Sequence, residues 1–288
     1  MTRLLLGVNV STSAAPGADP VADARAAENL GFDFVSASDH PGSAHPSYET
    51  WTLLSWIAAA TSRVVVMPRV LGVPFRAPAV VAKAAESLDR LSGGRLLLGL
   101  GAGGDDAEFR ALGVPAGTPG EKVRGLEDAV RIVRGMWREP SFTHTGTIYR
   151  TEGARLEPKP SGSIPVWLGT FGDRALEVTG RLADGWIPSR GYVPDQALAV
   201  MRGRVTAAAE RAGRDPDSVT CALNTRVIVD DHDGRDADQF TGPPVKIIDN
   251  VRRYAELGFT AFNFSPAGDD PAGQVRRLAG EVLPAVRS

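Results

Sequence analysis

The 288-residue sequence contains only one cysteine, Cys221, which excludes an internal disulfide bond and is typical of a reducing compartment. Its four histidines are scattered, and no HxxxH or CxxC spacing occurs, so the sequence predicts no metal site. No stretch approaches the roughly 18 apolar residues that a bilayer-spanning helix requires. We therefore expect a cytoplasmic protein without a membrane partner.

An excess of positive charge is also missing, because 32 Lys and Arg residues stand against 34 Asp and Glu residues. The formal net charge of -2 and the absence of like-charge runs argue against a nucleic-acid partner. The 43% hydrophobic and 23% charged content is that of a globular enzyme, and the length suits one α/β barrel. We expect a single domain, residues 1–288, that binds a small molecule.

Short apolar runs, which predict strands, alternate with segments of helical periodicity from end to end. The predicted strands are 4–10, 34–38, 64–67, 95–99, 166–169, 185–188, 220–229 and 261–264. The predicted helices are 20–30, 50–60, 79–91, 120–137, 173–183, 195–212, 245–257 and 274–286. Eight strand–helix units without a linker predict parallel strands that close into a (β/α)8 TIM barrel of the α/β class.

Two connections are longer than the others and are read as insertions in the barrel. The first follows the fourth strand, over residues 102–119. The second precedes the fifth strand and contains a predicted hairpin over residues 142–149 that turns at Gly146.

The segment Ser38-Asp39-His40-Pro41 follows the second predicted strand, and barrel enzymes carry their reacting groups at such carboxyl ends. A histidine exchanges protons near neutral pH, and a neighbouring carboxylate can bind a polar ring edge. The alternative is that Asp39 caps a turn and His40 is an ordinary loop residue. The position at a strand end favours the functional interpretation, with His40 as the catalytic residue.

Gly99, Gly101 and Gly104 match the G-x-G-x-x-G pattern of dinucleotide-binding folds, with Glu121 near the distance of a ribose-binding acid. Glycines and prolines between residues 113 and 120 interrupt the helix that this pattern requires. Eight strand–helix units that close into a barrel also argue against the open sheet of a dinucleotide-binding fold. We therefore reject this interpretation.

Seven segments in chain order resemble the luciferase-like monooxygenase superfamily, and most closely its branch that uses the deazaflavin coenzyme F420. They are 38–40 (SDH), 51–54 (WTLL), 78–83 (PAVVAK), 88–96 (LDRLSGGRL), 99–103 (GLGAG), 108–113 (EFRALG) and 183–186 (ADGW). The resemblance implies a bacterial-luciferase-like barrel that binds F420, or alternatively FMN.

Three parts of the family's cofactor site are carried over by this resemblance. The implied residues are Asp39, His40, Val70, Leu71, Gly72, Gly169, Thr170, Phe171 and Gly172. Asp39 and His40 would lie beside the deazaflavin ring of the cofactor. The segment 70–72 would form a bulge, with a non-proline cis peptide, behind that ring. The turn 169–172 would hold phosphate through backbone amides at a helix N-terminus. Without the resemblance, 70–72 is a plain strand end and barrel phosphate sites more often follow strands seven and eight.

The resemblance implies hydride transfer between F420 and a small organic substrate, with His40 giving or taking a proton, in a homodimer. Two alternatives remain open: an FMN-dependent monooxygenase, and a non-catalytic carrier of deazaflavin or flavin. The sugar-phosphate dehydrogenases of this branch have Glu, Trp and Glu where this sequence has Ser13, Ala44 and Gly104. We therefore expect a less polar substrate, or a reduction rather than an alcohol oxidation.

Overall fold

The computed structural model describes residues 3–42, 44–232 and 238–287, and within them eight parallel strands form a ring. These strands are β1 (Leu5–Asn9), β2 (Phe34–Ala37), β3 (Val65–Pro68), β5 (Leu98–Gly101), β8 (Val166–Gly169), β9 (Gly185–Trp186), β10 (Thr220–Val229) and β12 (Ala261–Pro266). Their order is β3-β2-β1-β12-β10-β9-β8-β5. The ring closes where Val66 N–H donates to the Arg95 carbonyl (2.9 Å) and Leu97 N–H to the Val66 carbonyl (3.1 Å). The predicted barrel is confirmed.

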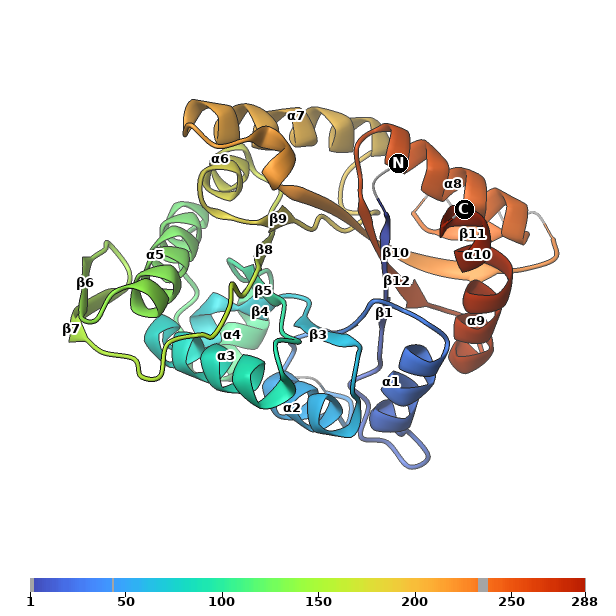
Figure 1. Ribbon diagram of the computed structural model, residues 1–288, viewed down its shortest axis with the longest axis horizontal. Helices are drawn as coiled ribbons and strands as arrows, with labels where there is room; N and C mark the ends of the chain where they lie inside the picture. The colour runs from blue at the N-terminus through green and yellow to red at the C-terminus, as the bar shows by residue number, and fades with distance from the viewer. Residues whose placement is uncertain (1–2, 43, 233–237, 288) are drawn as a thin grey trace.

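The helices surround this ring (Figure 1). They are α1 (Pro20–Asn29), α2 (Thr50–Ala60), α3 (Pro78–Ser92), α5 (Pro119–Arg138), α6 (Asp173–Leu182), α7 (Asp195–Arg211), α8 (Pro244–Glu256), α9 (Pro271–Arg277) and α10 (Leu283–Arg287), with a π-helical turn over Leu278–Val282. Local signals set several ends. Thr118 and Glu121 form a capping box at the start of α5, and Gly93 ends α3 with a φ of 76°. The first seven predicted helices match the structure within two residues at each end, and the eighth appears as three helical segments.

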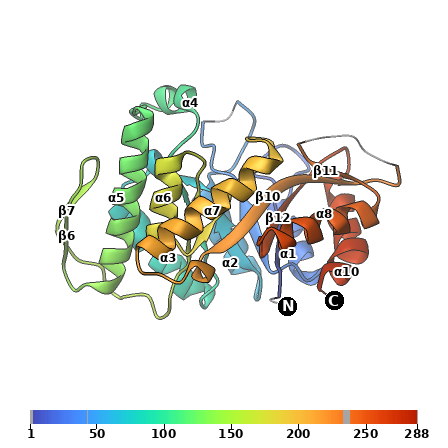
Figure 2. The same ribbon diagram turned by 90° about the horizontal axis from the view of Figure 1, so that it is seen from above.

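The two insertions contain more regular secondary structure than the sequence predicts. The loop after β5 contains a short helix, α4 (Asp106–Ala111), which lies opposite the chain termini (Figure 2). The predicted hairpin is confirmed, but its second strand comes later, so that β6 (Phe142–Thr145) pairs with β7 (Arg150–Ala154). The side chain of Asp128 on α5 anchors the hairpin through His144 (3.0 Å) and the Ile148 N–H (2.8 Å).

Two further strands extend the ring beyond the predicted eight. β4 (Leu71–Gly72) continues the chain after β3 and pairs with β5. β11 (Phe240–Gly242) pairs in parallel with the long end of β10. A 3-10 turn over Val73–Phe75 joins β4 to the segment that leads into α3.

The interior of the barrel is filled near the amino ends of its strands. The side chains that pack there are Phe34, Met67, Leu97, Trp167, Ile187, Ala222 and Ala261. Gly7 and Gly185 make room for the aromatic rings of Phe34 and Trp167. A Cβ atom at Gly7 would lie 2.2 Å from the Phe34 ring, and one at Gly185 would lie 2.4 Å from the Trp167 ring. A ligand can therefore enter only from the carboxyl ends of the strands.

Candidate active site at the carboxyl ends of the strands

His40 follows β2, and its side chain is 66% exposed. Its Nδ1 atom lies 2.9 Å from Oε2 of Glu108, a residue of α4 whose side chain is only 8% exposed. The other oxygen of Glu108 accepts the Gly42 N–H at 2.8 Å. A carboxylate accepts hydrogen bonds only, so Nδ1 carries hydrogen and Nε2 is left to exchange a proton with a ligand.

Asp39 precedes His40, but its side chain has no exposed surface. Arg76 donates to both carboxylate oxygens, at 2.8 and 2.9 Å, and the Gly72 N–H donates at 2.9 Å. Glu49, the N-cap of α2, is the second carboxylate on Arg76. Burial lowers the pKa of Arg76, but the hydrogen bonds to the two carboxylates outweigh it and leave this pKa above its ordinary value. Asp39 thus links the end of β2 to β4, and its buried side chain is not accessible to the edge of a cofactor ring.

A non-proline cis peptide joins Arg69 to Val70, at the entry to the segment 70–72 that the resemblance singled out. Val70 packs into the barrel, where a Cβ atom at Gly101 would lie 2.5 Å from its Cγ2 and one at Gly169 would lie 3.2 Å from it. The two glycines therefore accommodate the Val70 side chain. This arrangement forms a bulge between β3 and β4.

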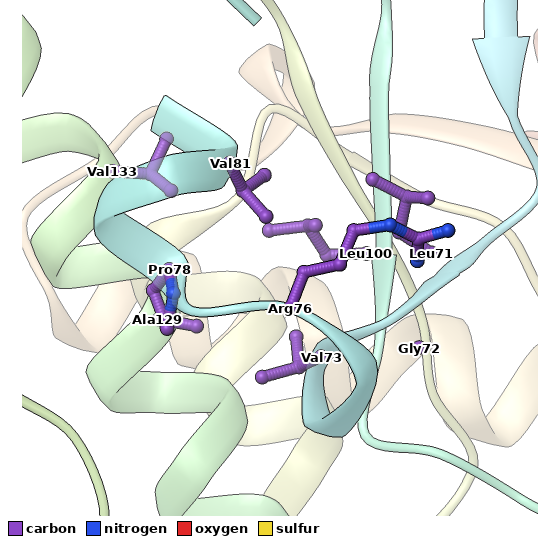
Figure 3. A pocket seen from close by; sticks show the side chains of 9 residues that line it. All are labelled: Leu71, Gly72, Val73, Arg76, Pro78, Val81, Leu100, Ala129 and Val133. Carbon is purple, nitrogen blue, oxygen red and sulfur yellow. The ribbon is translucent and has the colours of Figure 1, made fainter. Parts of the chain in front are cut away.

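Leu71 is buried on the outer side of the bulge, against α3 and α5 (Figure 3). A cavity of about 10 Å³ lies there, lined by Leu71, Gly72, Val73, Arg76, Pro78, Val81, Leu100, Ala129 and Val133. This space holds no more than one water molecule, so the cavity is a packing gap and not a ligand site. A ligand in the barrel mouth can reach Leu71 only through its backbone.

The turn 169–172 lies between β8 and α6, and its side chains point in different directions. Thr170 is buried, and its hydroxyl pairs with the Thr179 hydroxyl at 2.8 Å. Gly172 is the N-cap of α6 and provides no side-chain cap. The Phe171 ring stacks on Tyr192, with centroids 5.4 Å apart. The turn offers a ligand backbone amides and an aromatic face, but not the Thr170 hydroxyl.

A chain of polar side chains, which the sequence reasoning missed, crosses the interior above the apolar layer. Ser36 donates to Asn263 (2.9 Å), and Asn263 donates to Asn224 (2.8 Å). Asn224 donates in turn to Ser189 at 2.8 Å. Single Asn and Ser residues within strands carry no pattern that would have identified them. The chain makes one side of the mouth polar.

The described residues contain no group of three or more His, Cys, Asp or Glu that could hold a metal ion. None of the described helices is long and apolar enough to cross a bilayer.

The fold thus brings an exposed histidine, its carboxylate partner and the bulge to the carboxyl ends of the strands, where barrel enzymes carry their reacting groups. Residues 4–258 match the family described as luciferase-like monooxygenase, and the chain belongs to this family. The resemblance seen in the sequence is confirmed.

Named relatives of the chain act on different substrates. It is 28% identical to an F420-dependent glucose-6-phosphate dehydrogenase of Intrasporangium calvum, over 91% of this chain and 92% of that protein. It is 29% identical to a 5,10-methylenetetrahydromethanopterin reductase of Archaeoglobus fulgidus, over 71% of this chain and 58% of the reductase. The fold resembles that of an F420-dependent secondary alcohol dehydrogenase solved with an F420–acetone adduct. This likeness has a TM-score of 0.89 and 20% identity, and covers 99% of this chain and all of that one.

Proposed function

We propose that this protein is an F420-dependent oxidoreductase that transfers a hydride between the cofactor and a small organic substrate. The observation that carries the proposal is the His40–Glu108 pair at the mouth of the barrel. Hydride transfer to a carbonyl, or from an alcohol, requires a proton donor or acceptor, and Nε2 of His40, which bonds to none of the described residues, would fill this role. Relatives named as F420-dependent enzymes support deazaflavin as the hydride carrier.

The residues at the mouth fit such a cofactor. When bound, F420 would give or take the hydride at carbon C5 of its ring. The bulge made by Val70 and the backbone of Leu71 and Gly72 would support the ring, since small residues surround Val70. The turn 169–172 would hold the phosphate through backbone N–H groups at the start of α6, because no side chain caps them.

Asp39 has an indirect part in this proposal. Its carboxylate accepts the Gly72 N–H and so holds the bulge in place, with Arg76 neutralising its charge. His40 is the group that would touch substrate.

Cofactor titration tests the proposal directly. We expect the purified protein to bind F420 with a micromolar or lower Kd, and FMN more weakly, as measured by fluorescence. A clear preference for FMN would support the monooxygenase alternative. Tight F420 binding without turnover across alcohols, carbonyls and activated alkenes would support the non-catalytic carrier.

We also propose that the protein acts in the cytoplasm as a homodimer formed through α2 and α3. Trp56, Val80 and Leu91 on these helices are large apolar residues that are exposed to solvent. The groove between α2 and α3 is lined largely by apolar and small side chains, including those of Trp51 and Leu88. Exposed apolar surface of this kind is typical of an interface.

Light scattering of the purified protein tests the dimer. We expect a dimer for the parent protein and a monomer for Leu91→Glu. Val200→Glu is the control, because Val200 is an exposed apolar residue of α7, outside the groove. A monomeric parent, or a dimer that survives Leu91→Glu, contradicts this interface.

A further inference from the structure

Arg69 lies directly before the bulge, and its side chain has only neutral partners. Its Nε donates to Asn9 Oδ1 at 3.2 Å, and its Nη2 donates to Ser38 Oγ at 2.8 Å. No other described residue forms a hydrogen bond with its Nη1. No carboxylate of the described residues lies within ion-pair distance of this guanidinium. Most of its N–H groups are therefore free for a ligand.

Three other half-buried arginines of the barrel pair with carboxylates, as Arg76–Asp39 (2.8 Å), Arg134–Asp184 (2.7 Å) and Arg190–Asp195 (3.0 Å). Arg95 and Arg214 have only neutral partners, as Arg69 does, but both of their Nη atoms donate to backbone carbonyls. Arg69 differs from these two in having an Nη atom to which no described residue is bonded. An enclosed cation without a counter-ion is costly, and a folded protein usually pairs it. Burial lowers the pKa of Arg69 to about 10, although nearby Tyr192 opposes the effect. The side chain therefore remains a cation at neutral pH.

The surroundings of Arg69 match a substrate site. Asn9 also lies within 3.3 Å of the Ser36 hydroxyl, so Arg69 stands at one end of the polar chain that crosses the mouth. Tyr192, which acts on the pKa of Arg69, stacks on Phe171 and gives the mouth an aromatic wall. Arg226 adds a second positive charge, because strand alternation places it on the same inner face of β10 as Asn224.

Arg69 lies between the proposed phosphate turn and the polar chain that crosses the mouth. It follows β3, which is two places from β8 in the ring, and Tyr192 near it stacks on Phe171 of the turn. Its partner Asn9 ends β1, four places from β8 and thus on the opposite side of the ring. The hydrogen bonds of Arg69 to Asn9 and Ser38, on the side of the polar chain, favour the substrate as the source of the anion.

We propose that Arg69 binds an oxyanion of the substrate, so that the substrate is an organic anion such as a carboxylate. This inference rests on the proposed function and adds to it the class of substrate. It differs from the sequence expectation of a less polar substrate or a reduction, which considered only the missing groups at Ser13, Ala44 and Gly104. The planar guanidinium suits the two oxygens of a carboxylate.

Benzoate and benzamide are suitable probes, because they share an aromatic ring and differ in charge. Calorimetric titration of the F420-loaded protein should show that benzoate binds about tenfold more tightly, as one charge-assisted hydrogen bond provides. Arg69→Met should remove this preference. Arg138→Met should keep it, because Arg138 ends α5, on the outside of the barrel, and loses the same charge. Arg69→Gln, which retains polar contacts, replaces the Met variant if melting curves show that the latter is unfolded.

The F420 affinity of each variant shows whether Arg69 binds an anion of the substrate or the phosphate of the cofactor. We expect it to stay within about threefold of the parent value, because the phosphate turn is unchanged. Equal affinity of the parent for both probes overturns the inference, as does a benzoate preference that survives in Arg69→Met. Loss of F420 affinity in Arg69→Met with benzoate preference intact would assign Arg69 to the cofactor. If the parent fails to bind F420 at all, the proposed function fails, and titration of the cofactor-free protein still tests Arg69.

Discussion

Asp39 and His40 are consecutive residues with opposite surroundings. The Asp39 side chain is fully buried and accepts three hydrogen bonds, whereas His40 is mostly exposed and has one partner among the described residues. A saturated carboxylate holds structure, while a half-satisfied imidazole can still exchange a proton with a ligand. The comparison teaches that one short motif divides into a structural residue and a reacting one.

Replacement of His40 tests the reacting half of this comparison and has the largest expected effect. We predict that His40→Ala folds and still binds F420, because the His40 side chain is 66% exposed and the hydrogen bonds that hold the bulge come from Asp39. Turnover should fall by about 10²–10⁴-fold, the usual loss for one general acid or base. Steady-state kinetics on any working substrate measures this, with melting curves as the control. A rate constant equal to the parent's would make His40 only a wall of the pocket.

Replacement of Asp39 tests the structural half. We predict that Asp39→Ala lowers the free energy of unfolding by about 3–5 kcal/mol, because it leaves Arg76 with one carboxylate in a buried site. Denaturant unfolding measures the change. Asp39→Ala with Arg76→Met removes both charges and should recover part of the loss. A single variant as stable as the parent would show that the ion pair does not hold the bulge.

Glu108 belongs to the reacting half, since its two carboxylate oxygens hold His40 Nδ1 and the Gly42 N–H. Glu108→Gln can keep the Gly42 contact, but its amide would donate to Nδ1 and move the imidazole hydrogen to Nε2. We predict a fall in kcat of about tenfold or more, as for other tautomer changes, with little change in KM. Nitrogen NMR of the His40 ring should show the tautomer change in the absence of substrate. An unchanged ring spectrum would show that Glu108 does not set the tautomer.

The sequence predicts the barrel well because each strand and helix leaves a local record of period and stop signals. Residues 220–229 and 166–169, for example, form strands with the predicted bounds. Contacts between distant residues leave no such record. Glu108 reaches His40 across 68 positions, from a six-residue helix set among glycines and prolines. Arg69 looks like any polar residue after a strand, and its lack of a counter-ion is visible only in three dimensions.

Gly169 tests whether the bulge and the phosphate turn act together. Its φ is not positive, so backbone strain is no reason for a glycine here. A Cβ atom at this position would lie 3.2 and 3.3 Å from the two methyl groups of Val70. We predict that Gly169→Val displaces the bulge and weakens F420 binding about tenfold, as measured by fluorescence titration. Gly203→Val is the control, because Gly203 lies on α7, outside the turn, and nothing lies within 4 Å of a Cβ atom there. Equal affinity for Gly169→Val and the parent would place the cofactor elsewhere.

Thr170 is the neighbour of Gly169 and has the smallest expected effect. The resemblance places Thr170 in the phosphate turn, but in the structure its hydroxyl pairs with the Thr179 hydroxyl in the protein interior. Thr179 also donates to the Ala175 carbonyl at 2.9 Å, so it keeps a partner in Thr170→Ala. We therefore predict a loss of about 0.5–1.5 kcal/mol in the free energy of unfolding, the usual value of one hydrogen bond. The Kd for F420 should stay within about twofold of the parent's. Denaturant unfolding and fluorescence titration of the same preparation separate the two effects. A stable variant with weakened F420 binding would show that the Thr170 hydroxyl turns toward the phosphate when the cofactor binds.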